Sequence, residues 1–394
     1  MKHLLLLVAI GVLALFYFPV GCDSSGGGGG GNQAVDDAPQ TTDVVISSVR
    51  DLGVIRTNPM ILKRDCGFSG RYQDKSVWVF GDTMLDSPNA EDSVLLSSSC
   101  SSTVDFDAGD GIEGLTEEVD AVGAPLEFFP LTEQERAYNT RNVGEVCEED
   151  SCTAHWRIWP GTVLVDEDKD WAYVFYRKIL AHSGVFKFQH VGHSIAIWKD
   201  LSEPVERPVF NYFESYPTLF FTEGDGDGFG SAAVVAVRDA YIFGCELGED
   251  KLTKPCNLAR VPLADILEKE KWSFFAGNGN WSPNLADSTV IFHGNDMMSV
   301  FFNPYISRYV AIYSESLGSS AMLRTADRPE GPWSEPIELF TVDAPENFHG
   351  WVYDFLAHPE LSPDDGRTLY VTYTKKLDQM HSEMRLVAIE LEAP

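Results

Sequence analysis

The chain has 394 residues, enough for one large or two medium domains, and its apolar fraction of 44% is ordinary for a globular protein. Its formal net charge is −31. Proteins that bind nucleic acid need clustered Lys and Arg against the phosphates, so this charge argues against such a partner. Solubility in an exposed compartment is the plainer reason for the acidity.

The first 21 residues have the pattern of a secretory signal. A basic start precedes an uncharged apolar run from residue 4 to residue 20, and no stop-transfer charges follow it. Val20-Gly21-Cys22 resembles a bacterial lipobox, in which Cys22 becomes the lipidated first residue, although Pro19 departs from the pattern. We therefore expect residues 1–21 to be a lipoprotein-type signal peptide. An ordinary cysteine after a simple signal peptide is the alternative.

Residues 22–43 are polar and contain an unbroken glycine run from 26 to 31. Such a composition cannot bury enough apolar surface to fold. We expect a flexible tether that holds an exported domain, residues 44–394, near a membrane of the bacterial cell envelope, with Cys22 as the lipid anchor.

Cysteine usage agrees with an oxidising compartment. Without Cys22 six cysteines remain, an even number, and none has the spacing of a zinc site. Disulfides are therefore expected rather than a metal. Short separations suggest the pairs Cys147–Cys152 and Cys245–Cys256, and elimination leaves Cys66–Cys100.

A turn followed by an aromatic-rich β-segment recurs five times. The segments are residues 76–81, 171–176, 240–244, 308–313 and 368–373. They lie roughly 60 to 95 residues apart, and a four-stranded propeller blade needs about 40 to 50 residues plus loops. Each segment follows another candidate strand, at residues 65–69, 156–165, 230–237, 297–302 and 351–357.

Five such hairpins in series predict an all-β protein, a five-bladed β-propeller. A β-sandwich also has many short strands, but its strands need not resemble one another as these do. One helix is expected, at residues 263–271. The innermost strands of a propeller line a central channel, so residues at their ends converge from distant positions on a concave site.

Several short motifs occur in an order that resembles the bacterial domain-of-unknown-function family 4185. They are Arg64-Asp65-Cys66-Gly67, Val79-Phe80-Gly81-Asp82-Thr83, Trp156-Arg157-Ile158-Trp159-Pro160, Phe221-Thr222-Glu223-Gly224-Asp225-Gly226, Arg324-Thr325-Ala326 with Pro329-Glu330-Gly331-Pro332-Trp333-Ser334, and Ala357-His358-Pro359-Glu360-Leu361. The resemblance extends over about residues 45 to 390. It implies a five-bladed propeller related to furanosidase-type glycoside hydrolases, and some members are similar to endo-acting D-arabinan hydrolases.

Glycoside hydrolysis needs two carboxyl groups across the scissile bond, one to protonate the leaving oxygen and one to activate water or attack the anomeric carbon. In related propellers the base or nucleophile comes from the first blade and the acid from a middle blade. Asp65 fits the first role. Glu223 fits the second, because its apolar neighbours favour a protonated carboxyl. Asp65 can equally cap a turn, Glu223 can be a solvated loop residue, and Glu214 is a competing acid.

Further polar candidates are Asp82, Asp354 and His358. Asp82 follows a strand end, where a turn-forming Asp is also common. Asp354 heads the fifth inner strand and can modulate a neighbouring acid or bind a sugar hydroxyl. His358 can organise a cation or a water molecule, although a lone His is more often a satisfied structural donor.

Four aromatic residues near the predicted inner strands can stack on a sugar ring, and we expect two of the four to be core residues instead. They are Trp156, Trp159, Trp351 and Tyr353. Residues 105–111 and 225–227 weakly resemble calcium loops, but the EF-hand spacing fails, and we interpret both as solvated acidic loops. No metal and no cofactor is therefore expected, and a structural calcium in the channel has no support.

These patterns together predict an exported, lipid-anchored glycoside hydrolase that acts on a furanose-rich polysaccharide such as arabinan. Its partners would be a poly- or oligosaccharide and, through Cys22, a membrane. The alternative is a non-catalytic carbohydrate-binding or cell-envelope scaffold propeller that lacks the acid–base pair. A cation-dependent lyase is a third hypothesis, but it needs a basic residue beside the acids, and the sequence offers few.

Overall fold

A computed structural model describes residues 44–141, 154–182, 187–223, 228–248, 253–316, 318–343 and 351–392. They belong to a compact unit that spans residues 39–394. The expected signal peptide and tether, and the cysteines Cys22, Cys147 and Cys152, lie outside the described residues. Within the described part of the chain, no helix has both the length and the apolar character needed to cross a bilayer.

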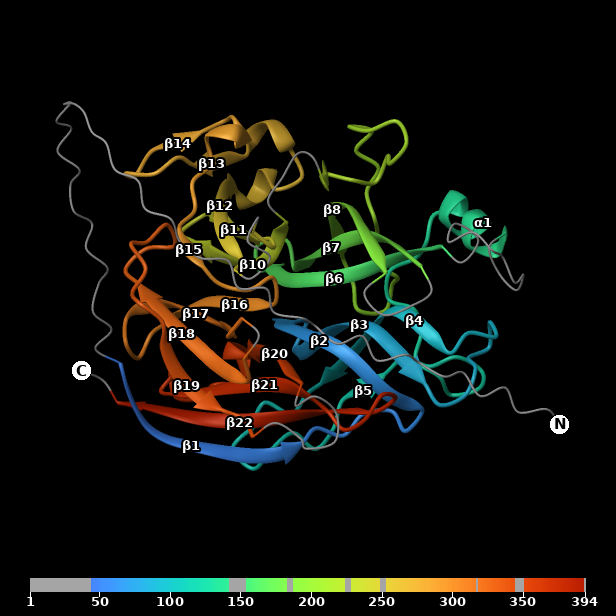
Figure 1. The fold of residues 1–394 in the computed structure, drawn as a ribbon, viewed down its shortest axis with the longest axis horizontal. Helices are drawn as coiled ribbons and strands as arrows, with labels where there is room; N and C mark the ends of the chain where they lie inside the picture. Colours follow the sequence, from blue (N-terminus) through green and yellow to red (C-terminus); the bar gives the residue numbers. More distant parts are fainter. Residues whose placement is uncertain are drawn as a thin grey trace, which may run out of the picture. The chain divides into compact units, whose positions relative to one another are not determined.

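The strands form five antiparallel sheets in chain order (Figure 1). Blade 1 contains β2 (Ile61–Tyr72), β3 (Lys75–Leu85), β4 (Leu95–Thr103) and β5 (Thr116–Glu117). Blade 2 contains β6 (His155–Asp166), β7 (Trp171–Ala181), β8 (Phe188–Trp198) and β9 (Phe221–Thr222). Blade 3 contains β10 (Phe229–Ala236), β11 (Asp239–Cys245), β12 (Pro255–Pro262), β13 (Ser273–Phe275) and β14 (Trp281–Ser282), and β15 (Phe292–His293) also pairs with β12.

The last two sheets complete the ring. Blade 4 contains β16 (Met298–Asn303), β17 (Arg308–Ser314), β18 (Ser320–Ala326) and β19 (Ile337–Thr341). Blade 5 contains β20 (Val352–Ala357), β21 (Thr368–Lys376), β22 (Ser382–Glu392) and β1 (Val45–Val54). The inner strands β2, β6, β10, β16 and β20 contact one another in a closed cycle. This confirms the five-bladed propeller, and the five predicted hairpins are the first two strands of each blade.

Blade 5 is closed by a strand from the opposite end of the domain. β1 pairs with β22, with Val45 opposite Glu392 and Val54 opposite Arg385, and the two strands lie side by side in Figure 1. The ring is therefore joined by backbone hydrogen bonds between the first and the last strand of the propeller.

The central residues of the second strand of each hairpin are mostly apolar and buried on both faces of the strand. In β3 the segment from Val77 to Phe80 is fully buried. An aromatic ring on such a strand fills the space between two sheets, and buried apolar area of this kind contributes most of the stabilisation of the fold. Each aromatic segment that recurs in the sequence thus supplies the rings that pack between one blade and its neighbours.

One α-helix is present among the described residues, α1 (Glu133–Arg141), in the connection from blade 1 to blade 2. Its Glu135 is buried and forms ion pairs of 2.6 Å with Lys178 and 2.7 Å with Arg207. The expected helix at residues 263–271 is wrong. That segment forms two 3₁₀ turns, η3 (Leu263–Asp265) and η4 (Lys269–Lys271); η5 (Leu285–Asp287) and η6 (Pro359–Leu361) are similar turns.

The physical reason for this error is a weak helix start. The residue before η3 is Pro262, which offers no side-chain cap for the first N–H groups. A segment of about nine residues barely repays the cost of nucleation unless it is capped or tightly packed.

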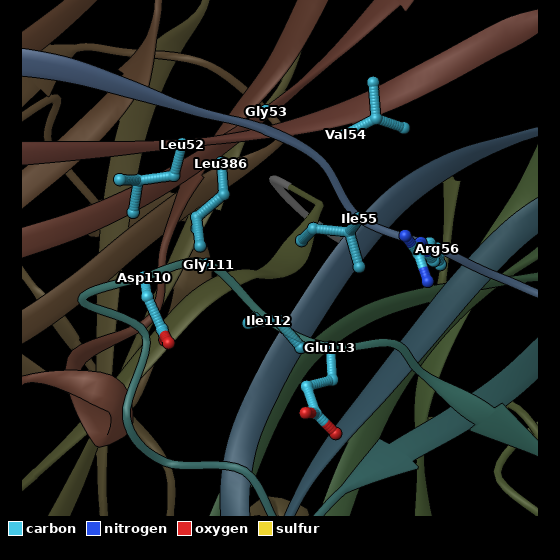
Figure 2. A pocket seen from close by; sticks show the side chains of 10 residues that line it. All are labelled: Leu52, Gly53, Val54, Ile55, Arg56, Asp110, Gly111, Ile112, Glu113 and Leu386. Carbon is cyan, nitrogen blue, oxygen red and sulfur yellow. The ribbon is translucent and has the colours of Figure 1, made fainter.

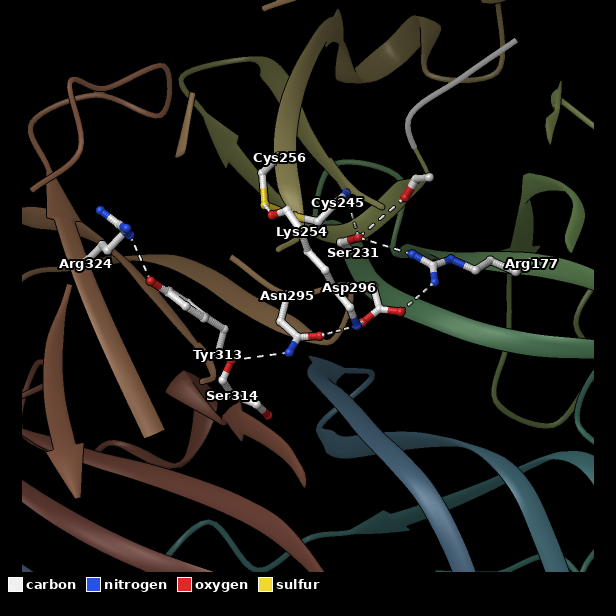
Figure 3. Close-up of a disulfide and its surroundings, with 11 residues drawn as sticks. Arg177, Ser231, Cys245, Lys254, Cys256, Asn295, Asp296, Tyr313, Ser314 and Arg324 are labelled. Carbon is white, nitrogen blue, oxygen red and sulfur yellow. Dashed lines mark hydrogen bonds and ion pairs between the residues drawn. A yellow bond between two sulfur atoms is a disulfide. The ribbon is translucent and has the colours of Figure 1, made fainter. Parts of the chain in front are cut away.

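Of the expected disulfides, Cys245–Cys256 is confirmed and Cys66–Cys100 is wrong. Cys245 and Cys256 lie opposite each other on β11 and β12 and are bonded (Figure 3). Cys66 and Cys100 are free thiols. They lie on β2 and β4, with β3 between them, and two strand spacings of about 4.8 Å exceed the span that a disulfide can bridge.

Candidate active site at the heads of the inner strands

Carboxyl groups from blades 1 and 5 meet where the inner strands begin. We call Asp65, Asp82 and Asp354 the aspartate cluster. Asp65 lies near the start of β2, Asp354 near the start of β20, and Asp82 on β3 directly after the residue that pairs with Asp65. Asp65 and Asp82 are partly exposed, whereas Asp354 is only 6% exposed. The first two carboxyl groups can therefore contact a ligand. The buried Asp354 can influence the site only through its neighbours.

Two reciprocal hydrogen bonds join β2 to β20. The Tyr353 hydroxyl donates to Asp65 Oδ1 at 2.5 Å, and the backbone N–H of Cys66 donates to Asp354 Oδ2 at 2.6 Å. The neighbours Tyr353 and Asp354 on β20 thus bond to the neighbours Asp65 and Cys66 on β2. The arrangement fixes both carboxyl groups relative to each other, which any acid–base pair requires.

Asp82 is held from blade 2. The indole N–H of Trp159 donates to Asp82 Oδ1 at 2.9 Å. Trp159 is partly exposed, and its ring centroid lies 4.9 Å from that of Phe188 and 6.2 Å from that of His190. These rings offer an apolar surface directly beside a carboxyl group, as a sugar-binding site needs.

The backbone at this site is strained. Cys66, Asp82 and Asp354 have positive φ angles of 71°, 33° and 57°, although none is glycine. The pairing of β2 with β3 slips around residues 65 to 68, and that of β20 with β21 slips after Tyr353. Such bulges and left-handed residues cost free energy and redirect side chains, and they are frequent at functional sites.

Burial and mutual repulsion raise the pKa values of the cluster. Burial and the charge of Asp65 raise the pKa of Asp354 to about 8 and that of Asp82 to about 6. Burial also raises the pKa of Asp65, but the Tyr353 hydrogen bond and the charges of Lys63 and Lys376 oppose that rise. The charge of Asp65 thus opposes ionisation of both neighbours, and Asp354 keeps its proton at neutral pH.

Three basic side chains adjoin these carboxyl groups, contrary to the expectation that few would. Lys63 and Lys376 favour the ionised form of Asp65, and Arg157 and Lys63 favour that of Asp82. They come from blades 1, 2 and 5. The sequence separations hide this proximity, because only the ring brings the three blades together.

A fourth carboxyl group, Asp296, was not anticipated. Asp296 lies just before β16, forms an ion pair of 3.1 Å with Arg177 and a second with Lys254 (Figure 3), and these two cations hold its pKa well below the usual range. Its charge also contributes to the raised pKa of Asp354. Its position at the head of an inner strand, as for Asp65 and Asp354, is the signal that could have identified it.

The structure places the other candidates away from the cluster. Glu223 follows β9, the outermost strand of blade 2, and its side chain is exposed, so the expected apolar enclosure is absent. Glu214 is also exposed. Trp156 packs against Lys178, whose Nζ lies 4.4 Å from the ring centroid, and against Tyr138.

His358 is fully buried and belongs to the core. Its Nδ1 lies 2.6 Å from Ser69 Oγ and its Nε2 lies 2.7 Å from Thr372 Oγ1, so both ring nitrogens have partners. The ring stacks on Trp78 at 4.0 Å. The structure thus gives His358 the satisfied structural arrangement that was the alternative to ligand binding.

A separate cavity of about 510 Å³ lies between the end of β1 and the loop around residues 110–113 (Figure 2). Its lining shares no residue with the aspartate cluster. The acidic loop beside it is held by its own carboxyl groups, since Asp105 accepts from the N–H groups of Asp107 and Glu113. The described residues contain no group of His, Cys, Asp or Glu arranged to hold a metal, and residues 225–227 lie outside them.

A sequence profile described as "Domain of unknown function (DUF4185)" matches residues 180–379, half of the chain. The chain belongs to the DUF4185 family. The match starts at the end of β7, so it covers the last strands of blade 2 and all of blades 3 and 4, and it ends in blade 5 beside Lys376. No curated protein matches the chain.

Several solved structures are similar to this DUF4185 chain over most of its length. A candidate hydrolase from Bacteroides ovatus ATCC 8483 is 15% identical with a TM-score of 0.54, covering 90% of this chain and 97% of the other. A family 117 glycoside hydrolase from Zobellia galactanivorans is 10% identical, with a TM-score of 0.48 and coverages of 88% and 91%. The α-L-arabinofuranosidase of Podospora anserina is 10% identical, with a TM-score of 0.44 and coverages of 87% and 98%. At these identities the likeness concerns the fold alone.

Proposed function

We propose that this DUF4185 protein is a glycoside hydrolase that acts on a furanose-rich polysaccharide through the carboxyl groups of Asp65 and Asp82. The observation that carries the proposal is the aspartate cluster itself. Its two partly exposed carboxyl groups have different hydrogen-bond donors, Tyr353 for Asp65 and the partly exposed Trp159 for Asp82.

In this proposal each carboxyl group has one role. Asp65, supported by Tyr353 and two lysines, is the ionised base or nucleophile. Asp82, whose pKa of about 6 leaves part of the population protonated near neutral pH, is the general acid. Asp354 is a positioning residue that orients the Cys66 backbone and keeps a proton beside Asp65.

Export and anchoring at Cys22 are also part of the proposal. They are supported by the signal-like residues 1–21 and the glycine-rich residues 22–43, which lead into the folded unit. A polysaccharide substrate is too large to enter cells readily, so an enzyme placed in the cell envelope would meet it.

The test is incubation of the full chain with a panel of furanose-rich and other polysaccharides, followed by measurement of the reducing ends released. Cleavage of arabinan by the wild type is expected, with a loss of at least a hundredfold in the Asp65→Asn variant. Asn can still accept the Tyr353 hydrogen bond, so thermal unfolding should be nearly unchanged.

Binding without cleavage by the wild type would favour the alternative, a carbohydrate-binding propeller without an active acid–base pair. Unchanged turnover in Asp65→Asn would remove Asp65 from the mechanism. Asp51→Asn is a matched control, because Asp51 lies on β1, outside the cluster, and pairs with Arg385.

A further inference from the structure

Aromatic rings lie on both sides of the aspartate cluster. Trp351 is 37% exposed and lies 5.6 Å from Tyr353, ring centroid to ring centroid, on the blade 5 side. Trp159 and Phe188 lie on the blade 2 side, where a partly exposed histidine, His190, accompanies them. The blade 2 side therefore offers a polar group as well as apolar rings.

The fold brings His190 to the same end of blade 2 as the aspartate cluster. His190 is near the start of β8, and β8 runs in the same direction as the inner strand β6, because both are antiparallel to β7. The His190 ring centroid lies 6.2 Å from that of Trp159, the donor to Asp82, and 5.4 Å from that of Phe188. His190 is thus one ring away from a carboxyl group of the proposed site.

Three charged side chains, which we call the ion triad, adjoin the same histidine. Asp296, just before β16 of blade 4, pairs with Arg177 on β7 of blade 2 and with Lys254, just before β12 of blade 3 (Figure 3). Arg177 lies directly opposite Trp159 in the pairing of β7 with β6. The charges of all three members act on the ionisation of His190. His190 therefore lies near both Trp159 and the ion triad.

The ion triad and the aspartate cluster border the same region. Met297 Sδ lies 3.5 Å from Cys66 Sγ, and these two residues directly follow Asp296 and Asp65 in the chain. The charge of Asp296 also adds to the raised pKa of Asp354. A ligand held by the aspartate cluster would therefore come within reach of side chains beside the ion triad.

His190 lacks the internal hydrogen bonds that a structural histidine has. Within the residues that the structure describes, neither of its ring nitrogens has a hydrogen-bond partner, whereas both nitrogens of His358 have one. Burial and the charges of Arg177 and Lys254 lower the pKa of His190 to about 4, so its ring is neutral near pH 7. A neutral imidazole has one N–H donor and one acceptor nitrogen. Both are available to a ligand, and a polar group in such a place is stabilised by a partner.

We propose that His190 is a specificity-determining residue, which forms a hydrogen bond with a hydroxyl group of the saccharide bound at the aspartate cluster. This inference rests on the saccharide ligand proposed above and adds a contact on the blade 2 side. A hydroxyl group matches a neutral imidazole, because each of them can both donate and accept a hydrogen bond. The sugar ring that carries this hydroxyl packs against Trp159 and Phe188.

The experiment measures kcat and KM of the full chain on neutral arabinan oligosaccharides of one length. Calorimetry measures their binding to the wild type and to Asp65→Asn, in which the oligosaccharide stays intact. His190→Phe keeps a ring beside Trp159 and Phe188 but removes both polar nitrogens. It should raise KM and the dissociation constant about tenfold and change kcat less than about threefold, because the hydrogen bond is made in the ground state and the transition state alike.

Two conservative variants separate the hydrogen bond from the shape of the ring. Asn and Gln each have a donor and an acceptor, near the place of Nδ1 in His190→Asn and near that of Nε2 in His190→Gln. At least one of them should keep KM within about threefold of the wild type, and it identifies the nitrogen that contacts the sugar.

Gln189→Phe is the matched control. Gln189 is exposed and adjacent to His190 on β8, and side chains alternate along a strand, so it points to the opposite face. This variant should leave KM and kcat unchanged. Thermal unfolding of each variant shows whether it is folded.

The inference is overturned if the wild type binds no arabinan oligosaccharide, or if His190→Phe keeps the wild-type KM and affinity. It is also overturned if all three variants at His190 lose affinity equally, since the ring would then act by packing alone. Cleavage that needs Asp65 but not His190 would overturn this inference and leave the proposed hydrolase standing. Binding that needs His190, with no cleavage by the wild type, would support the contact and contradict the hydrolase.

Discussion

Two polar clusters lie a few residues apart along β2 and the segment that runs from β20 to β21. The aspartate cluster occupies the heads of these strands. Further along, Ser69 and His358 form a second cluster with Glu360 and Thr372, which we call the histidine cluster: Ser69 Oγ donates to Glu360 at 2.6 Å and lies 2.6 Å from His358. In the histidine cluster His358 and Thr372 are fully buried and Ser69 and Glu360 are partly exposed, and none of the four residues has a positive φ angle.

The two clusters handle charge in opposite ways. Burial lowers the pKa of His358 to about 3, so that this ring is neutral near pH 7, and burial also raises the pKa of Glu360. The aspartate cluster instead combines repelling carboxyl groups, nearby cations and strained backbone. A hydrogen-bonded network around a neutral histidine stabilises a fold, whereas a strained and charged network costs stability and is retained where chemistry needs it. Changes in the two clusters should therefore separate activity from stability.

The largest expected effect is on activity. Asp82→Asn should lower kcat/KM about 10²–10⁴-fold, because the proposed general acid is lost. In the wild type kcat/KM should fall as pH rises through about 6, the pKa of Asp82. Reducing-end assays across pH measure both effects. Asp86→Asn, an exposed change near the end of the same hairpin, should leave activity unchanged, and a variant at Asp82 with wild-type turnover would contradict the assignment.

A change in the histidine cluster should act on stability instead. His358→Ala removes a fully buried ring, its two hydrogen bonds and its stacking on Trp78, and should lower the free energy of unfolding by about 3 kcal/mol. Urea denaturation measures the change. His381→Ala removes an exposed histidine and should change stability by less than about 0.5 kcal/mol. A His358→Ala variant that kept full stability but lost activity would contradict the structural role assigned to the histidine cluster.

Asp354→Asn should change how stability depends on pH. The pKa of Asp354 is about 8 in the folded protein and near 4 when unfolded, so the wild type loses stability as pH rises from about 4 through 8. Asn does not ionise and can still accept from the Cys66 N–H. The variant should therefore be about 2–4 kcal/mol more stable than the wild type at pH 9 and similar at pH 4. Parallel pH dependences in the two proteins would show that Asp354 is already ionised at neutral pH.

The smallest effect is expected from Trp159→Phe. The indole N–H favours the ionised form of Asp82, so its loss should raise the pKa of Asp82 further, by up to about one unit. The high-pH limb of kcat/KM should move upward by the same amount. Trp351→Phe, on the other side of the cluster, should leave that limb in place. A downward shift in Trp159→Phe would contradict the role of this hydrogen bond.

The fold could be predicted because its signal is local. Each blade begins with a hairpin whose aromatic and β-branched residues alternate along a few positions. β1 was missed because it is mostly exposed, has no regular alternation of apolar and polar residues, and pairs with β22, which is distant in sequence. Helix α1 was missed for a related reason, since its buried residue is Glu135 and its stabilising contacts come from Lys178 and Arg207.

The site could be predicted only where a residue heads an inner strand. Asp65 and Asp354 were found in this way, and Asp296 meets the same criterion without belonging to any of the recognised motifs. Glu223 has apolar neighbours in sequence, but adjacency in the chain does not determine whether a side chain is enclosed. Lys63 and Arg157 could not be placed, because their approach to Asp82 depends on how blades 1 and 2 pack.

The pairing of β1 with β22 also orders the events of biosynthesis. β1 is the first strand of the propeller to leave the ribosome, and β22 is the last. The ten residues of β1 therefore have no strand partner while four blades and most of the fifth are synthesised. The charged residues Arg50 and Asp51 at the middle of β1 oppose pairing of this unpartnered strand with other chains. Ring closure therefore cannot precede the synthesis of β22.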